Sequence, residues 1–191
     1  VLDAWRANPA ALDRNGDGVL QYVMLEGEPG HQDSLLRTEH SVRTLTAAGV
    51  SMEKLSNHAA DWQRGPAKIR MQRWLEELGE AIEVVFANND DMALGAIDAC
   101  VDAGMEPEEM PFIVGVDATA PALRAVEEGT LRGTVLNDAA GQAEDILALS
   151  CALAQGEDPG AAVELEDEKY CWRQHTAVTR ENLAEFLPET S

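Results

Sequence analysis

The chain has 191 residues, which is enough for one substantial domain with a hydrophobic core. It carries 14 Lys and Arg against 35 Asp and Glu, a net charge of −21 that disfavours nucleic-acid binding and suits a protein that meets divalent cations. No apolar run approaches the length of a membrane span, so we expect no membrane insertion. The chain opens within a helical pattern and without Met, and we expect any signal segment to lie outside it.

The first motif, DRNGDGVLQ, alternates side chains that carry oxygen. These are Asp13, Asn15, Asp17 and Gln21. The spacing matches the first nine positions of an EF-hand-like calcium loop, in which Val19 would contribute only its backbone carbonyl. The twelfth position, where an EF-hand has a bidentate Glu, is Met24, so a last carboxylate would have to come from elsewhere in the fold. A turn of the DxNxDG type without a metal is the alternative.

Strands and helices then alternate along the chain. The sequence predicts strands near 20–26, 54–59, 82–87, 112–116 and 134–136, with helices near 32–48, 67–78, 91–103 and 120–128. Such alternation indicates βαβ units and a parallel sheet covered on both faces. Beyond residue 138 we expect a helix near 143–154, a loop at 156–160, a strand-like run near Tyr170 and a last helix near 180–186. The apolar face of the helix at 32–48 is expected at Leu35, Leu36, Val42 and Leu45.

Polar side chains follow four of these strands at their carboxyl ends, where ligands bind in open parallel sheets. They are His31 and Asp33, then Asn88, Asn89 and Asp90, then Asp117, and finally Asn137. Each has a structural alternative: Asp33 pairs with Arg37 one helical turn on, Asn89 or Asp90 caps a helix, and the others are turn residues. Their convergence on one crevice favours a binding site.

The chemistry of this set suits a sugar. A pyranose presents hydroxyls that both donate and accept around an apolar ring, so carboxylates, a guanidinium and an Asn amide can all bind it. Trp62 lies in a polar neighbourhood just past the second strand and could stack on the ring, although a core Trp is the alternative.

The sequence gives little support for an enzyme. The four His residues lack metal spacing, and the chain has neither a GxSxG elbow nor a phosphate-binding loop. Asp33 and Asp117 could form the acid/base pair of a glycoside hydrolase, but Arg37 at helical spacing would keep Asp33 ionised. Three cysteines show no CxxC spacing, and Cys100 and Cys151 are expected to be buried thiols.

The segments NGDGVLQYVMLEGEPGH, IEVVFANND, FIVGVDA and GTVLND closely resemble the family of bacterial periplasmic galactose/glucose-binding proteins, from about Trp5 to Phe186. The resemblance implies an α/β fold, with a parallel sheet flanked by helices that forms the C-terminal lobe of a two-lobed protein. It implies that most of the N-terminal lobe is outside this chain. Residues 1–137 would be the C-terminal lobe, 138–172 a crossover segment of the N-terminal lobe, and 173–191 a return to the C-terminal lobe.

The same resemblance assigns site residues. The hexose-contacting positions would be His31, Asp33, Arg37, Trp62, Asn89, Asp117 and Asn137. A structural Ca²⁺ would be held by Asp13, Asn15, Asp17, the Val19 carbonyl, Gln21 and a remote carboxylate, Glu83. The apolar helix around Ile146, Leu147, Leu149 and Leu153 would pack on the other lobe, and left bare it would invite self-association.

The implied function is that of a solute-binding protein for galactose or glucose, not of an enzyme. It would deliver the sugar to a membrane ABC permease and to a chemoreceptor, in the periplasm or outside the cell, either free or tethered as a lipoprotein. The sugar-sensing domain of a repressor of the LacI type is the first alternative, although such sensors do not usually carry this metal site. A glycoside hydrolase is the second.

Overall fold

The computed structural model describes residues 1–187, and the chain divides into two compact units. Of the described residues, the first unit contains Val1–Val135 and 177–187, and the second contains Leu136–Thr176. The boundaries expected from the sequence, after residues 137 and 172, lie a few residues away from these. Residues 188–191 of the expected last segment lie outside the described residues.

The first unit is built on a parallel four-stranded sheet with the order β2-β1-β3-β4. Its strands are β1 (Leu20–Glu26), β2 (Met52–Ala59), β3 (Val84–Ala87) and β4 (Phe112–Val114). Two further strands, β5 (Thr134–Leu136) and β6 (Thr176–Val178), pair with each other, and a bridge from Gly133 to Val114 joins this pair to β4. The α/β class predicted from the alternation is confirmed.

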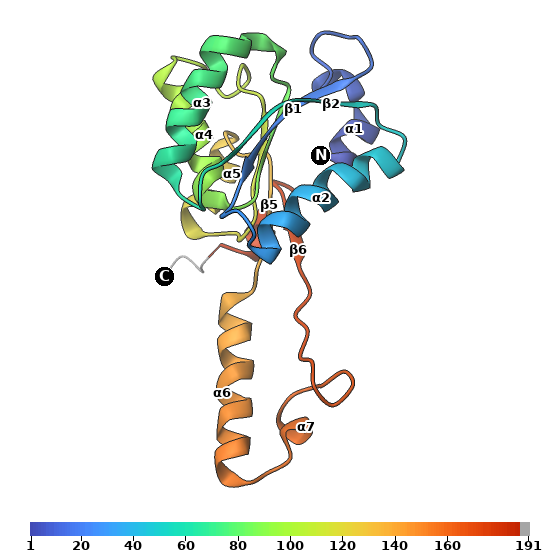
Figure 1. Ribbon diagram of the computed structural model, residues 1–191, viewed down its shortest axis with the longest axis vertical. Helices are drawn as coiled ribbons and strands as arrows, with labels where there is room; N and C mark the ends of the chain where they lie inside the picture. The colour runs from blue at the N-terminus through green and yellow to red at the C-terminus, as the bar shows by residue number, and fades with distance from the viewer. Residues whose placement is uncertain (188–191) are drawn as a thin grey trace. The chain divides into compact units, whose positions relative to one another are not determined.

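Helices cover both faces of the sheet, as Figure 1 shows: α3 and α4 lie on one side, and α1 and α2 on the other. The helices of this unit are α1 (Leu2–Ala7), α2 (Gln32–Ala47), α3 (Arg64–Leu78), α4 (Asp90–Asp102) and α5 (Ala120–Glu128). Single 3-10 turns occur at Pro9–Ala11, Gly79–Ala81 and Leu183–Glu185. Gly95 lets α4 approach α3 closely, because a Cβ there would collide with the Arg64 carbonyl oxygen. No helix in residues 1–187 combines the length and apolarity that crossing a membrane requires.

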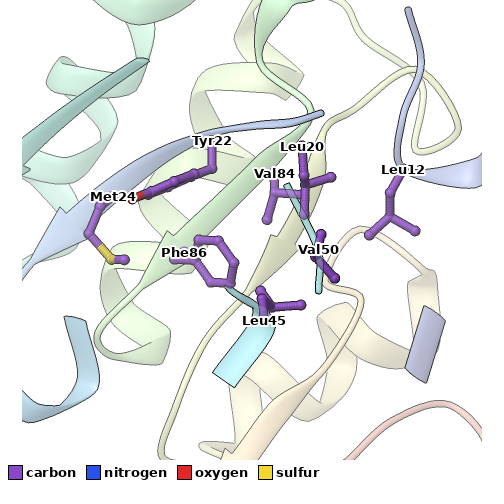
Figure 2. Packing of buried hydrophobic residues seen from close by; sticks show 8 residues of the cluster. All are labelled: Leu12, Leu20, Tyr22, Met24, Leu45, Val50, Val84 and Phe86. Carbon is purple, nitrogen blue, oxygen red and sulfur yellow. The ribbon is translucent and has the colours of Figure 1, made fainter. Parts of the chain in front are cut away.

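The core on the α2 side follows the two-residue period of β1, as Figure 2 shows. Its buried members are Leu12, Leu20, Tyr22, Met24, Leu45, Val50, Val84 and Phe86. The Tyr22 and Phe86 rings meet edge to face with centroids 5.5 Å apart. Burying each such large side chain contributes about 1.5–3 kcal/mol. The cluster therefore holds α2, through Leu45, and the segment before β1, through Leu12, against the sheet.

Two expectations about burial are wrong. Leu35 and Leu36 of α2 are 60% and 43% exposed, because the face that α2 turns inward carries Leu45 and the small polar Ser34. Cys151 is exposed, whereas Cys100 is buried as expected, and burial raises the pKa of its thiol to about 12.

The second unit differs from its prediction in three respects. Helix α6 (Ala139–Gln155) begins four residues early because the Asp138 side chain accepts a hydrogen bond from the Gly141 N–H and caps it. The expected loop contains a short helix, α7 (Pro159–Ala162). Near Tyr170 the structure has an isolated bridge to Glu166 in place of a strand.

The C-terminal part of the chain also differs from its prediction. A single 3-10 turn replaces the expected last helix, and strand β6 was not expected.

Candidate functional site

Two of the predicted sugar-contacting residues, His31 and Asn89, lie at the carboxyl end of the sheet, where each caps the N-terminus of a helix. His31 caps α2, its Nδ1 accepting from the Asp33 N–H at 3.2 Å. Asn89 caps α4, its Oδ1 accepting from the Met92 N–H at 3.0 Å. Of the two residues predicted as alternative caps, Asn89 therefore caps the helix and Asp90 does not. The Nδ2 of Asn89 is left to donate to the loop that contains Trp62.

Arg37 joins three segments at this end of the sheet. Its Nη1 donates to the Asn88 carbonyl oxygen at 2.7 Å and lies 3.5 Å from Asp117 Oδ1, and its Nη2 lies 3.4 Å from Asp33 Oδ2. The two carboxylate contacts are long and partly exposed, so each contributes only about 0.2–1 kcal/mol to stability. These contacts place the carboxylates of Asp33 and Asp117, which can accept hydrogen bonds, next to the Arg37 guanidinium, which can donate them.

Trp62 forms a half-buried aromatic plate beside Arg37. The His31 ring meets it edge-on at 5.2 Å between centroids, and Arg37 Cζ lies 5.7 Å from its ring centre. Asn89 Nδ2 donates to the Trp62 carbonyl oxygen at 3.2 Å, and the ring packs directly on the backbone of Gly27. Trp62 has a φ of 65°, a left-handed conformation that is uncommon for a bulky residue and that marks a constrained, candidate functional position.

The structure thus brings six of the seven predicted positions into one contact network. Its members are His31, Asp33, Arg37, Trp62, Asn89 and Asp117. The seventh, Asn137, belongs to the second unit, where its Oδ1 accepts from Gln142 Nε2 at 2.7 Å.

Two residues of the Asn88-Asn89-Asp90 run have roles that sequence reasoning missed. Asn88 is buried, and its Oδ1 accepts from the Gly27 N–H at 3.1 Å and from the hydroxyls of Ser34 and Thr38 at 3.2 Å each. Asp90 is also buried, and it accepts hydrogen bonds from Thr134, the first residue of β5, and from Thr119 in the loop after β4. The only signal in the sequence was three consecutive polar residues after a buried strand.

The predicted calcium loop folds around its own side chains. Asp13 accepts from the Gly16 and Gly18 N–H groups at 2.7 and 2.9 Å. Asp17 Oδ1 accepts from the Val19 N–H at 2.8 Å, which holds the pKa of Asp17 below its ordinary value. Its Oδ2 lies 3.1 Å from Asn15 Nδ2 and 2.9 Å from Gln21 Nε2.

Glu83, remote in sequence, lies against this loop just before β3. The side chain is 1% exposed, and its carboxylate accepts from the N–H groups of Arg14 at 2.6 Å, Asn15 at 3.3 Å and Gln21 at 3.0 Å. Within residues 1–187, no group of three or more His, Cys, Asp or Glu is arranged to hold a metal. The predicted set instead adds amide and backbone oxygens to its carboxylates. Such an all-oxygen set fits Ca²⁺, provided that the amides of Asn15 and Gln21 turn their oxygens inward.

A cavity of about 380 Å³ lies elsewhere, between α2 and the sheet. Tyr22, Met24, Val42 and Lys54 contribute to its lining. The described lining residues include none of the six network residues, so this cavity is distinct from the candidate sugar site.

Comparison with known proteins identifies close relatives. A family model described as a periplasmic binding protein domain matches residues 7–158. The chain is 41% identical over 190 residues to the D-galactose/methyl-galactoside binding periplasmic protein MglB of Haemophilus influenzae, a match that covers 98% of this chain and 56% of that protein. It is 34% identical over 146 residues to a xylitol-binding protein of Mycolicibacterium smegmatis, with 76% and 40% covered.

Among solved structures, the chain is similar to an ABC transporter solute binding protein from Bacillus halodurans C-125 with bound myo-inositol. The TM-score is 0.75 at 32% identity, and the match covers 94% of this chain and 57% of that one. The chain therefore spans about half the length of the relatives that it matches.

The contact between Gly27 and Trp62 can be tested by adding one carbon. A Cβ at Gly27 would overlap three atoms of the Trp62 ring, so Gly27→Ala should displace the indole and destabilise the fold by about 1–3 kcal/mol. The readouts are the NMR resonance of the Trp62 indole N–H, assigned with Trp62→Phe, and urea unfolding.

Gly65→Ala is the matched control, because Gly65 lies within α3 and a Cβ there meets nothing within 4 Å. It should leave the Trp62 resonance unchanged. An unmoved indole resonance in Gly27→Ala would show that the plate is not seated on this glycine.

Proposed function

Because the chain belongs to the periplasmic binding protein domain family, we propose that it supplies one sugar-contacting lobe of a hexose-binding protein that serves an ABC transporter. The observation that carries this proposal is the network at the carboxyl end of the sheet. There Arg37 links Asp33, Asp117 and the Asn88 carbonyl oxygen beside the Trp62 plate.

The network suits the chemistry of a hexose. The two carboxylates accept hydrogen bonds from sugar hydroxyls, the Arg37 fork donates, and the Asn89 amide does both. Trp62 would cover one face of the ring, where C–H groups form an apolar disc. None of these roles moves a proton, and the relatives described above are named as binding proteins rather than enzymes.

Galactose or glucose is the ligand that we propose. The relative named for galactose shares 41% identity across nearly the whole chain, whereas the xylitol-binding relative and the solved structure with bound myo-inositol are less similar. The residue types at the network positions and at Asn137 also suit a ring with several equatorial or axial hydroxyls. One set of contacts would accept both hexoses.

The mechanism is binding followed by closure. Because the chain spans about half of its relatives, we propose that a second lobe covers the other face of the sugar and that residues 138–172 belong to that lobe. The closed form would be recognised by the membrane permease and by a chemoreceptor. The protein would act in the periplasm or outside the cell.

We also propose that Ca²⁺ binds the loop before β1 and stabilises the fold. Its ligands would be Asp13, Asn15, Asp17, the Val19 carbonyl, Gln21 and Glu83. The support is the burial of Glu83 against the loop and the close approach of the Asp17, Asn15 and Gln21 side chains. The ion would neutralise the carboxylates of Asp13 and Asp17 in the loop and that of Glu83, which lies against it.

Calcium should raise the melting temperature. An ion that binds only the native chain adds about 2.7 kcal/mol at 100 times its Kd, which corresponds to roughly 5–10 °C for a chain of this size. Glu83→Gln should weaken calcium binding at least about tenfold, because it removes a carboxylate that approaches the ion from outside the loop. Calorimetric titration and melting with calcium or EDTA measure both effects.

The control is Glu80→Gln, the same chemical change at an exposed position three residues earlier. Met24→Ala, at the twelfth loop position, is unsuitable because Met24 is buried in the core. A melting temperature that changes with neither calcium nor EDTA would contradict the proposal. Equal calcium affinity in Glu83→Gln and Glu80→Gln would also contradict it.

The chain by itself should self-associate through α6. Ile146, Leu147 and Leu153 are exposed on this helix, and apolar faces of this kind are covered in stable proteins. Sedimentation velocity should show dimers or larger species, and Leu147→Glu with Leu153→Glu should return the chain to a monomer. Leu35→Glu, at an equally exposed position on α2, should not. A clean monomer of the native chain at high concentration would rule out the association.

The chain should bind hexoses only weakly. Water reaches an uncovered crevice, and losing several contacts at about 1 kcal/mol each weakens binding by about a thousandfold. NMR titration with galactose, glucose and myo-inositol should give millimolar affinities, with galactose or glucose preferred, and Asp33→Ala should abolish the response. Glu39→Ala, on the exposed side of the same helix, is the control. Micromolar or tighter binding by a monomer would contradict this expectation.

A further inference from the structure

Asp90 is an ionisable side chain with no exposure to solvent, next to the candidate sugar site. Its Oδ1 accepts from the Thr134 hydroxyl at 2.6 Å, and its Oδ2 accepts from the Thr119 N–H at 2.8 Å. Burial raises the pKa of this carboxyl, against the opposing effect of the two hydrogen bonds. A carboxylate is therefore kept in the interior at a cost, and its bonds reach β5 and the loop after β4.

The loop that Asp90 binds has an unusual backbone. Asp117 and Ala118 have φ angles of 125° and 55°, two consecutive non-glycine residues in a region that L-residues disfavour. Three successive amides hold this conformation. The Asp117 N–H donates to the Val135 carbonyl oxygen at 2.8 Å, the Ala118 N–H donates to the Thr134 hydroxyl oxygen at 3.2 Å, and the Thr119 N–H donates to Asp90.

Two of these three bonds depend on Asp90. It accepts one directly, and it orients the Thr134 hydroxyl so that an oxygen lone pair faces Ala118. Gly115 is part of the same arrangement, because a Cβ there would collide with Asp90 Oδ1. Helix capping does not account for the carboxylate, since Asn89 caps α4.

We propose that Asp90 is a positioning residue of the sugar site, which fixes residues 117–119 and thereby directs the Asp117 carboxylate toward Arg37. This inference rests on the proposed function. Asp117 Oδ1 lies 3.5 Å from Arg37 Nη1, and the same nitrogen binds the carbonyl oxygen of Asn88, two residues before Asp90. Residues 88–90 would thus fix the position of the Arg37 guanidinium, through the Asn88 carbonyl oxygen, and that of the Asp117 carboxylate, through Asp90.

Substitutions at Asp90 separate positioning from simple packing. Asp90→Ala leaves the Thr134 hydroxyl and the Thr119 N–H without their acceptor, so the loop is free to relax and Asp117 to leave Arg37. Asp90→Asn has nearly the same size and can accept from Thr119 while donating to Thr134, so it should preserve the loop. Thr134→Val removes the link between Asp90 and Ala118 with almost no change in volume.

The experiment titrates galactose into the full chain by NMR and follows amide hydrogen exchange at Asp117 and Ala118. Asp90→Ala and Thr134→Val should weaken the galactose response at least about tenfold and accelerate exchange at both amides. Asp90→Asn should stay within about threefold of the native chain in affinity. The control is Asp98→Asn, on the same helix as Asp90. It weakens the ion pair with Arg64 of α3, so it should change the stability of the fold but not the galactose affinity or the amide exchange at Asp117.

The outcomes separate this inference from the proposed function. If the native chain shows no galactose response, the sugar assignment is wrong, and exchange at Asp117 still tests whether Asp90 holds the loop. If Asp33→Ala abolishes the response while Asp90→Ala and Thr134→Val keep it, the site stands and the positioning role is overturned. Unchanged exchange at Asp117 and Ala118 in both folded variants would also overturn it.

Discussion

The candidate site depends on three consecutive side chains that follow β3, because each binds a different neighbouring segment. Asn88 holds the end of β1 and the first turns of α2, Asn89 holds the Trp62 carbonyl, and Asp90 holds the loop after β4. Two of the three are buried, and leaving a buried polar group unpaired costs about 1–3 kcal/mol. The loops at this end of the sheet are therefore held by hydrogen bonds to the side chains that follow β3.

The strand β3 carries a second polar anchor at its other end. Glu83 precedes Val84–Ala87 and binds the backbone of the loop at residues 14, 15 and 21. All strands of the four-stranded sheet run parallel, so this loop and the candidate sugar site lie at opposite ends of one short, buried strand. The same strand thus carries the proposed calcium loop at its start and the proposed sugar-contacting residues at its end.

The family assignment agrees with the proposal that this chain supplies one lobe of a larger binding protein. The chain belongs to the periplasmic binding protein domain family, as its resemblance predicted, and it spans about half of its relatives. The network around Arg37 is assembled within the first unit, from segments that the sheet brings together. Acceptors, a donor fork and an aromatic plate held on one sheet would need little reorganisation to receive a sugar, as the proposed function requires.

Local pattern in the sequence determined the alternation of strands and helices, the oxygen-rich loop and the polar ends of the strands, because these depend on neighbours a few residues apart. The family resemblance added Glu83 to the predicted calcium ligands and assigned hexose contact to residues that the strand ends had already singled out as candidates, together with Arg37 and Trp62. Only the tertiary structure decided that Leu35 and Leu36 face solvent, that Asn88 and Asp90 are buried, and that Asp117 takes a left-handed conformation. The hydrogen-bond partners of Asn88 and Asp90 cited here, Gly27, Thr119 and Thr134, lie 29 to 61 positions away, so the burial of these two residues depends on how the sheet brings distant segments together.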